Sequence, residues 1–285
     1  MLRRRRGLVT TLLLAPILAA APTWALARPA NLLLHQIIEI GPRAPAARAR
    51  DKWRHPEESL YFWGLRPGQT VIDVNPGGGY WTDIIAPFLA ETGGHYIAAT
   101  GDLKDPKLSE EDRRERTSIE AKYMSDARVY GDVKLAGFGP MSGPLAPPNS
   151  VDLVLVSRET HNWVRPKGFM QKALGDFYAA LKPGGVLAIE DHRAPEGADP
   201  AKGDGYIPQS YMIEQAAKAG FKLVGASEIN ANPKDTKDHP FGVWTLPPTR
   251  QSTPDGQPPN PNFDHSKYDA IGESDRMTLK FVKPG

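Results

Sequence analysis

The fold of this chain follows from one stretch of sequence, Thr70-Val-Ile-Asp-Val-Asn-Pro-Gly-Gly-Gly-Tyr-Trp-Thr82. Its first five residues are mostly β-branched and apolar, which is typical of a buried parallel strand. Three consecutive glycines follow, and because they lack a Cβ they allow a positive φ and a close approach of a ligand. From Tyr80 onward, apolar residues recur at three- and four-residue spacing, which predicts a helix. The helix N-terminus would present free N–H groups beside the glycines, so the stretch predicts a nucleotide-binding turn.

The residues after the glycines exclude two familiar phosphate-binding loops. A P-loop needs Lys and Ser or Thr after its last glycine, where this chain has Tyr80 and Trp81. A dinucleotide-binding fingerprint needs a glycine three residues after Gly79, where Thr82 stands. An acidic residue followed by a glycine-rich turn remains. On this motif alone, a glycine turn that binds nothing stays an alternative.

The pattern resembles motif I of the class I S-adenosylmethionine (SAM) methyltransferases, acid-x-Gly-x-Gly-x-Gly. Asp73 is the acid, Asn75 stands for the first glycine, and Gly77 and Gly79 match the other two. Asn suits the first position because it visits the left-handed region more readily than most residues. The resemblance implies SAM as the cofactor, bound by these four residues and by Tyr80.

The rest of the chain supplies the other elements of such a fold. Strands are expected at 94–100, 128–132, 151–157, 186–190 and 221–226, and helices at 109–123, 168–181 and 209–219. An alternating segment at 276–283 predicts a last, antiparallel strand. The run Leu-Lys-Pro-Gly-Gly185 before a strand strengthens the resemblance. It implies an α/β fold, a Rossmann-like seven-stranded, mostly parallel sheet with an antiparallel last strand and helices on both faces.

Two further acids are implied as cofactor ligands by the resemblance. In the methyltransferase pattern, an acid at the end of the second strand accepts hydrogen bonds from the ribose hydroxyls. Thr100 stands at the aligned position here and Asp102 follows two residues later, which is a departure from the pattern. Asp132, placed at the end of the third expected strand, would meet the adenine amino group, whose N–H a carboxylate accepts.

Polar residues follow the fourth and fifth expected strands, where ligands bind in sheets of this type. The resemblance implies in-line transfer of the sulfonium methyl group to a small-molecule acceptor, aided by alignment and, for a hydroxyl acceptor, by a base. His161 and His192 are candidate bases because imidazole titrates near neutrality, and Glu159 is a third candidate catalytic residue. A polar loop end without a catalytic role stays an alternative.

These residue types, together with Asp191, could also hold a metal ion, as carboxylates in the same place do in catechol-type O-methyltransferases. No helical His-x-x-x-His spacing accompanies them, so no metal site is expected.

Residues 1–27 have the pattern of a cleaved secretory signal peptide. Four arginines at 3–6 precede an apolar run at 8–21, and Ala25-Leu-Ala27 is a small-x-small cleavage pattern. A Sec signal is favoured over a twin-arginine signal. The expected mature protein is periplasmic or secreted, without a stable membrane anchor, and the closer likeness is to exported methyltransferases of Gram-negative bacteria.

Composition narrows the function further. The chain has no cysteine, which excludes disulfides, thiolate catalysis and cysteine-based zinc sites. Loss of residues 1–27 would remove four of 35 basic residues and none of 33 acidic ones, so the mature chain would carry 31 against 33. This balance gives no case for nucleic acid as a partner. The oligomeric state stays open.

The expected domain organisation is a helical extension at 28–54 and a methyltransferase-like domain at 55–285. Within it, 230–274 is rich in Pro, Asn and Asp and is expected to be a surface insertion with little regular structure. Two other functions stay open. Because SAM is made in the cytosol, an exported chain could be a non-catalytic small-molecule-binding protein, or an envelope interaction module that uses the insertion as its contact region.

Overall fold

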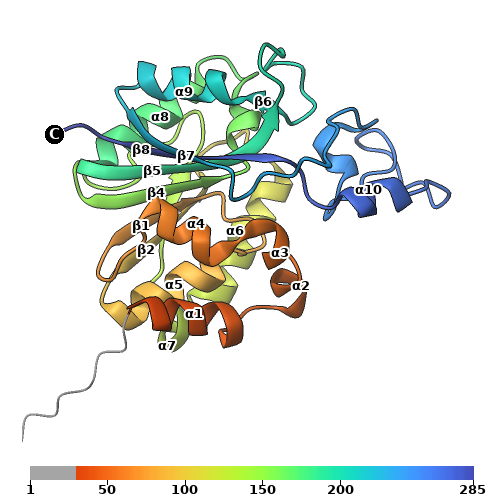
Figure 1. Cartoon of the computed structure of the whole chain (residues 1–285). Helices are drawn as coiled ribbons and strands as arrows, with labels where there is room; N and C mark the ends of the chain where they lie inside the picture. The colour runs from red at the N-terminus through yellow and green to blue at the C-terminus, as the bar shows by residue number, and fades with distance from the viewer. Residues whose placement is uncertain (1–29) are drawn as a thin grey trace, which may run out of the picture.

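The computed structural model describes residues 30–285, so the signal peptide expected at 1–27 lies outside the described residues. One eight-stranded sheet crosses the molecule, with helices on both of its faces (Figure 1). Seven strands lie in the order β3-β2-β1-β4-β5-β8-β7, and β6 pairs with β5 beside this path. β8 runs antiparallel to both of its neighbours, β5 and β7. The predicted α/β class with an antiparallel last strand is therefore confirmed.

The strand and helix boundaries follow the sequence patterns closely in most places. The strands are β1 Thr70–Val74, β2 His95–Gly101, β3 Lys134–Phe138, β4 Val151–Ser157, β5 Leu181–Ala194, β6 Ile207–Pro208, β7 Lys222–Ser227 and β8 Arg276–Val282. The α-helices are α1 Ala30–Ile40, α2 Pro45–Arg48, α3 Asp51–Arg54, α4 Pro56–Trp63, α5 Thr82–Thr92, α6 Glu110–Tyr123, α7 Ala127–Tyr130, α8 Phe169–Ala180, α9 Gln209–Lys218 and α10 Ser266–Ile271. Two short 3-10 helices are η1 Thr160–Trp163 and η2 Gly242–Thr245.

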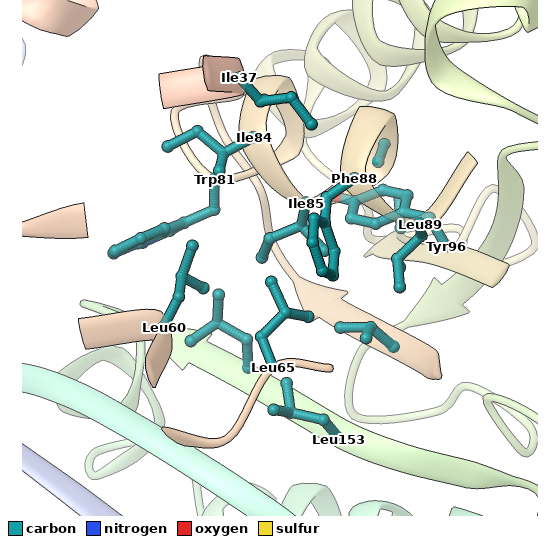
Figure 2. Packing of buried hydrophobic residues seen from close by; sticks show 14 of the residues in the cluster. Ile37, Leu60, Leu65, Trp81, Ile84, Ile85, Phe88, Leu89, Tyr96 and Leu153 are labelled. Atoms are coloured by element: carbon teal, nitrogen blue, oxygen red, sulfur yellow. The ribbon is translucent and has the colours of Figure 1, made fainter. Parts of the chain in front are cut away.

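Alternating side chains of the central strands enter two apolar cores, one on each face of the sheet. On β4, Leu153 belongs to one core and Val154 to the other, and both are fully buried. Figure 2 shows the first core, where apolar residues of α5 meet Leu60 and Leu65 near α4 and Ile37 of α1. α8 and α9 cover the opposite face. α1 packs against α5 and α4, and α4 contacts β8, so the N-terminal helices extend the first core outward from the sheet.

The third strand differs from its prediction. Residues 127–130 form α7, and β3 begins only at Lys134. Val129 and Tyr130 have strand-like side chains, but Gly131 takes a φ of +70° and its N–H bonds back to the Ala127 carbonyl, which closes a helical turn. The Tyr130 ring packs edge-on against Tyr123 at 4.8 Å. Tertiary packing therefore overrides local strand preference here.

The Leu-Lys-Pro-Gly-Gly run behaves as a strand with a bulge. α8 ends at Ala180, as the run predicts, but Leu181 already pairs with Val151 of β4. Val186 then pairs with Leu153, so residues 182–185 bulge out of the ladder. The expected strand at 186–190 is the middle of a longer one, which carries His192 on the same rigid element.

The segment 230–274 has few regular elements, η2 and α10, yet it packs firmly onto the domain. In Figure 1 it forms the blue region beside α10, at one end of the sheet. Asn230, Asp235 and Leu246 are buried, whereas most of residues 253–270 are exposed. Asn232 donates its side-chain amide to the carbonyls of Ile271 and Glu273, which ties the two ends of the segment together. Within residues 30–285, no helix is long and apolar enough to cross a membrane.

Candidate functional site

The glycine turn after β1 has the backbone conformation that its sequence predicts. Asn75 takes a φ of +46°, Gly77 +56° and Gly79 +81°. The expectation that Asn replaces a glycine in the left-handed region is thus confirmed. A Cβ on Gly79 would lie 1.6 Å from the Tyr123 hydroxyl, so α6 can approach the turn only because this residue is glycine.

Asp73, which the sequence predicts as a cofactor ligand, lies behind the turn and does not line the cavity described below. It is 1% exposed and accepts a hydrogen bond of 2.7 Å from the Tyr96 hydroxyl of β2. Burial raises the pKa of Asp73 to about 7, although hydrogen bonds from Tyr96 and Thr82 favour its charged form. Asp73 therefore fixes the turn to β2 and α5.

We expect Asp73→Asn to stabilise the protein more at pH 8 than at pH 5. A carboxyl whose pKa rises from 3.8 to about 7 on folding contributes stability below the lower value and loses it as pH rises through the higher one. Asn stays neutral and removes this loss, so the gain in the free energy of unfolding should be larger at pH 8 than at pH 5 by about 2–3 kcal/mol. Urea unfolding at both pH values measures it, with Asp132→Asn as the exposed control. Equal effects at both pH values would contradict the raised pKa.

A cavity of about 1520 Å³ opens at the carboxyl ends of β1 to β4. Asn75 of the turn, Thr100 and Asp102 after β2, and Glu159 and Asn162 after β4 line it. The structure thus brings both alternatives for the ribose position, Thr100 and Asp102, to the same wall. Ligands bind at this edge in open α/β sheets.

Tyr80 and Asp132 do not line this cavity, so the structure does not bring these two predicted cofactor ligands to it. The Tyr80 hydroxyl donates to the Asp51 carboxylate at 2.6 Å, and its ring lies 4.4 Å from the Arg54 guanidinium. Tyr80 therefore anchors the N-terminal helices. Asp132 precedes β3, at the end opposite the cavity, and its exposed carboxylate pairs with Lys134 at 2.6 Å.

Two glutamates contact the glycine turn from opposite sides of the cavity. The Asn75 side-chain amide donates to Glu159 Oε2 at 3.1 Å, and the Gly77 N–H donates to Glu115 Oε1 at 3.2 Å. The sequence does not predict Glu115 as a site residue, because the many charged residues of α6 are typical of a solvent-exposed helix. A signal was present, since Glu115, Ile119 and Tyr123 are spaced by four residues and share one helix face.

Asp191 and His161 form a hydrogen-bonded dyad between the ends of β4 and β5. Asp191 Oδ1 accepts from His161 Nδ1 at 2.8 Å, which leaves His161 Nε2 as the unprotonated nitrogen of the neutral ring. Burial disfavours both charges, but their mutual attraction lowers the pKa of Asp191 to about 2 and raises the pKa of His161. Glu159 and Asn162, which lie two residues before and one residue after His161, line the cavity, whereas His161, Asp191 and His192 do not.

His192 lies next to this dyad but in a different electrostatic state. Its ring centroid is 5.1 Å from that of His161, and its Nδ1 is 2.6 Å from the Ser274 hydroxyl. Burial lowers the pKa of His192 to about 3, with further lowering by His161, so it stays neutral near pH 7. The structure brings the two candidate bases together as expected, with different titration behaviour.

His161, Asp191 and His192 offer ligand atoms within 4.8 Å of one another, so their types and spacing could suit a metal ion. Both Asp191 oxygens already have protein donors, however. Oδ1 accepts from the His161 ring and the His192 N–H, and Oδ2 accepts from the His161 N–H and the Thr160 hydroxyl. Hydrogen bonding accounts for this carboxylate, and we describe the three residues as a hydrogen-bonded cluster.

Aromatic side chains from distant segments cover the dyad. The Trp244 ring in η2 lies 6.0 Å from the His161 ring, and the Tyr206 ring lies 6.1 Å from that of His192. The sequence predicts neither residue at the site, because nothing in the local sequence indicates which strand end is reached by the 230–274 segment, which carries Trp244, or by the loop before β6, which carries Tyr206. Trp163, at the end of η1, packs in the core against Phe138, with their ring centroids 5.4 Å apart.

The comparisons with known proteins cover part of the chain. No family model matches it. The ubiquinone/menaquinone biosynthesis C-methyltransferase UbiE of Citrobacter koseri is 30% identical over 132 residues. The alignment covers 46% of this chain and 46% of that protein, so the chain spans about half the length of this curated relative.

Solved structures extend the likeness in fold. The [4+2]-cyclase SpnF matches with a TM-score of 0.53 at 15% identity, over 81% of each chain. A proposed sarcosine dimethylglycine methyltransferase from Galdieria sulphuraria matches with a TM-score of 0.51 at 12% identity, over 90% of this chain and 98% of that one. At these identities the likeness concerns the fold. The chain therefore has the α/β fold found in methyltransferases, and in a cyclase as well.

Proposed function

We propose that the protein is a SAM-dependent methyltransferase that acts on a small-molecule acceptor. The observation that carries the proposal is the cavity that joins the glycine turn, at Asn75, to Glu159 and Asn162, the residues that flank His161 of the His161–Asp191 dyad in the sequence. The sequence likeness to a C-methyltransferase supports it. SAM is the expected cofactor and, when bound, would supply a sulfonium-activated methyl group.

The cavity residues fit this cofactor. Thr100 and Asp102 offer a hydroxyl and a carboxylate at the end of β2, where a ribose diol could be bound. Asn75 and Gly77 hold the positive-φ turn on the same cavity side. The volume of about 1520 Å³ exceeds the roughly 300–1,000 Å³ of ordinary small-molecule sites, which leaves room for an acceptor beside a nucleoside.

In this proposal His161 is the base for an acceptor that must lose a proton. Asp191 holds the proton on Nδ1, so Nε2 can receive one from the acceptor. The aromatic rings of Trp244 and Tyr206 lie beside the two histidines and restrict the entry of water. The positive charge that His161 gains is offset by the ionised Asp191.

We further propose that the protein is exported, on the strength of the basic, apolar and small-x-small pattern of residues 1–27. A non-catalytic binding protein with the same fold is the alternative that the next experiment tests.

We expect calorimetry to show micromolar binding of SAM and of S-adenosylhomocysteine, and Asp102→Ala to weaken both by about 10- to 100-fold, the cost of lost hydrogen bonds to a charged group. Asp132→Ala is the matched control, because it removes an acid that lies outside the cavity. Wild-type protein that is folded, by circular dichroism, and binds neither nucleoside would overturn the methyltransferase proposal and favour the non-catalytic binding protein.

A further inference from the structure

Glu115 and Glu159 approach the glycine turn from two separate elements, α6 and the corner between β4 and η1. Each bonds to the turn through a single oxygen, Oε1 of Glu115 to the Gly77 N–H and Oε2 of Glu159 to the Asn75 amide. Both line the cavity. Within residues 30–285, the second oxygen of each carboxylate has no hydrogen-bond partner and is not fully buried, so it is available to a ligand.

The charges around this pair are mostly negative. Within residues 30–285, neither glutamate forms an ion pair with Lys or Arg. The negative charges of Asp191 and Glu115 raise the pKa of Glu159, whereas protonated His161 lowers it. The negative charges of its helix neighbours Asp112 and Glu111 raise the pKa of Glu115.

Cationic residues are present in the cavity but pair elsewhere or are exposed. Arg116 donates to the carbonyls of Gly101 and Ala136, and Lys104 and Lys107 are exposed. Burial and like charge raise the pKa of Glu115, and burial raises that of Glu159 to about 7. Two partly buried carboxylates without a cationic partner favour a ligand that brings positive charge.

We propose that Glu115 and Glu159 form a carboxylate pair that attracts the sulfonium charge of the ligand, so that the site prefers SAM to S-adenosylhomocysteine. The two nucleosides share their ammonium and carboxylate groups, but only SAM carries a sulfonium charge. A methyltransferase with such a pair would release S-adenosylhomocysteine readily, because the sulfur of this product carries no charge. This inference rests on the proposed function.

The test compares three ligands by competition calorimetry at pH 8. They are SAM, S-adenosylhomocysteine, and sinefungin, an analogue with an amine near the position of the sulfonium. We expect SAM and sinefungin to bind about tenfold more tightly than S-adenosylhomocysteine, a difference within the range for two opposite charges about 4 Å apart at a partly exposed site. Glu159→Gln and Glu115→Gln should each reduce this preference to about threefold or less. Glu120→Gln, on the exposed part of α6, is the matched control and should keep it.

A pH series separates a charge effect from a change of shape. As pH falls from 8 to 6, Glu159 gains a proton, and the preference for SAM should shrink in wild type but stay flat in Glu159→Gln. Equal affinity for all three ligands in wild type, or an unchanged preference in both glutamine variants, would overturn this inference while leaving the proposed function standing. Folded protein that binds none of the three would overturn both.

Discussion

Glu273→Ala is expected to lower the free energy of unfolding by about 3–5 kcal/mol, the largest stability change that we predict for a single side chain. Glu273 is 4% exposed and accepts from three arginines. Its Oε1 is 2.6 Å from Arg50 Nε, and its Oε2 is 3.0 Å from Arg54 Nε and 2.9 Å from Arg276 Nη1. Arg54 and Arg276 are each 1% exposed, so the substitution would leave two buried guanidinium groups without this carboxylate.

Urea unfolding measures the change, with Glu228→Ala as the matched control. Glu228 also accepts from an arginine, Arg193, through both of its oxygens, but its side chain is 68% exposed. Surface pairs of this kind contribute about 0–1 kcal/mol. A loss below 1 kcal/mol for Glu273→Ala would mean that water reaches the arginines and that the network is not a buried one.

The network matters for the site because it continues to the glycine turn. Arg276 Nε is 3.1 Å from Glu190 Oε1, and Glu190 Oε2 accepts from the Ser157 hydroxyl at 2.7 Å. Ser157 in turn accepts from the indole N–H of Trp81, just before α5, at 2.9 Å. The chain of contacts links the N-terminal helices, the end of the 230–274 segment and the central strands, so Glu273→Ala should also weaken ligand binding.

The sequence predicted the elements whose signals are local. β4 has the predicted boundaries, Val151–Ser157, because a run of β-branched and apolar residues between turn residues suits a strand buried on both faces. The alternation of apolar and polar residues predicted β8. The spacing of Asn75, Gly77 and Gly79 predicted the turn after β1. In each case, the residues that fix the conformation are neighbours in the chain.

The parts that were missed depend on contacts between distant residues. Tyr80 follows the glycine turn, but whether it faces the cavity or the N-terminal helices depends on Asp51 and Arg54. Trp244 reaches His161 only because buried polar residues hold the 230–274 segment against the sheet. Spacing along the chain does not encode such pairings, so the candidate site could be predicted only at the strand ends.

His161→Ala is expected to lower kcat by about 10²–10⁴-fold, the usual contribution of a general base, with less than a threefold change in the Kd of SAM. Transfer of tritiated methyl groups from SAM to a metabolite extract identifies an acceptor, and single-turnover rates then measure the loss. His35→Ala is the control, since this histidine lies on α1 with its side chain 53% exposed and pairs with Glu57. Unchanged kcat in His161→Ala would remove this residue from the mechanism.

The pH dependence distinguishes His161 from His192 as the base. Asp191 raises the pKa of His161 above its ordinary value of 6.5, so the fraction of neutral base and the rate should rise with pH through that range. His192, with a pKa of about 3, is already neutral there and gives no such rise. Asp191→Asn removes the charge that stabilises protonated His161, so the transition should move to lower pH while kcat falls. A purely structural role for Asp191 would lower the amount of folded enzyme and leave the midpoint of the profile in place.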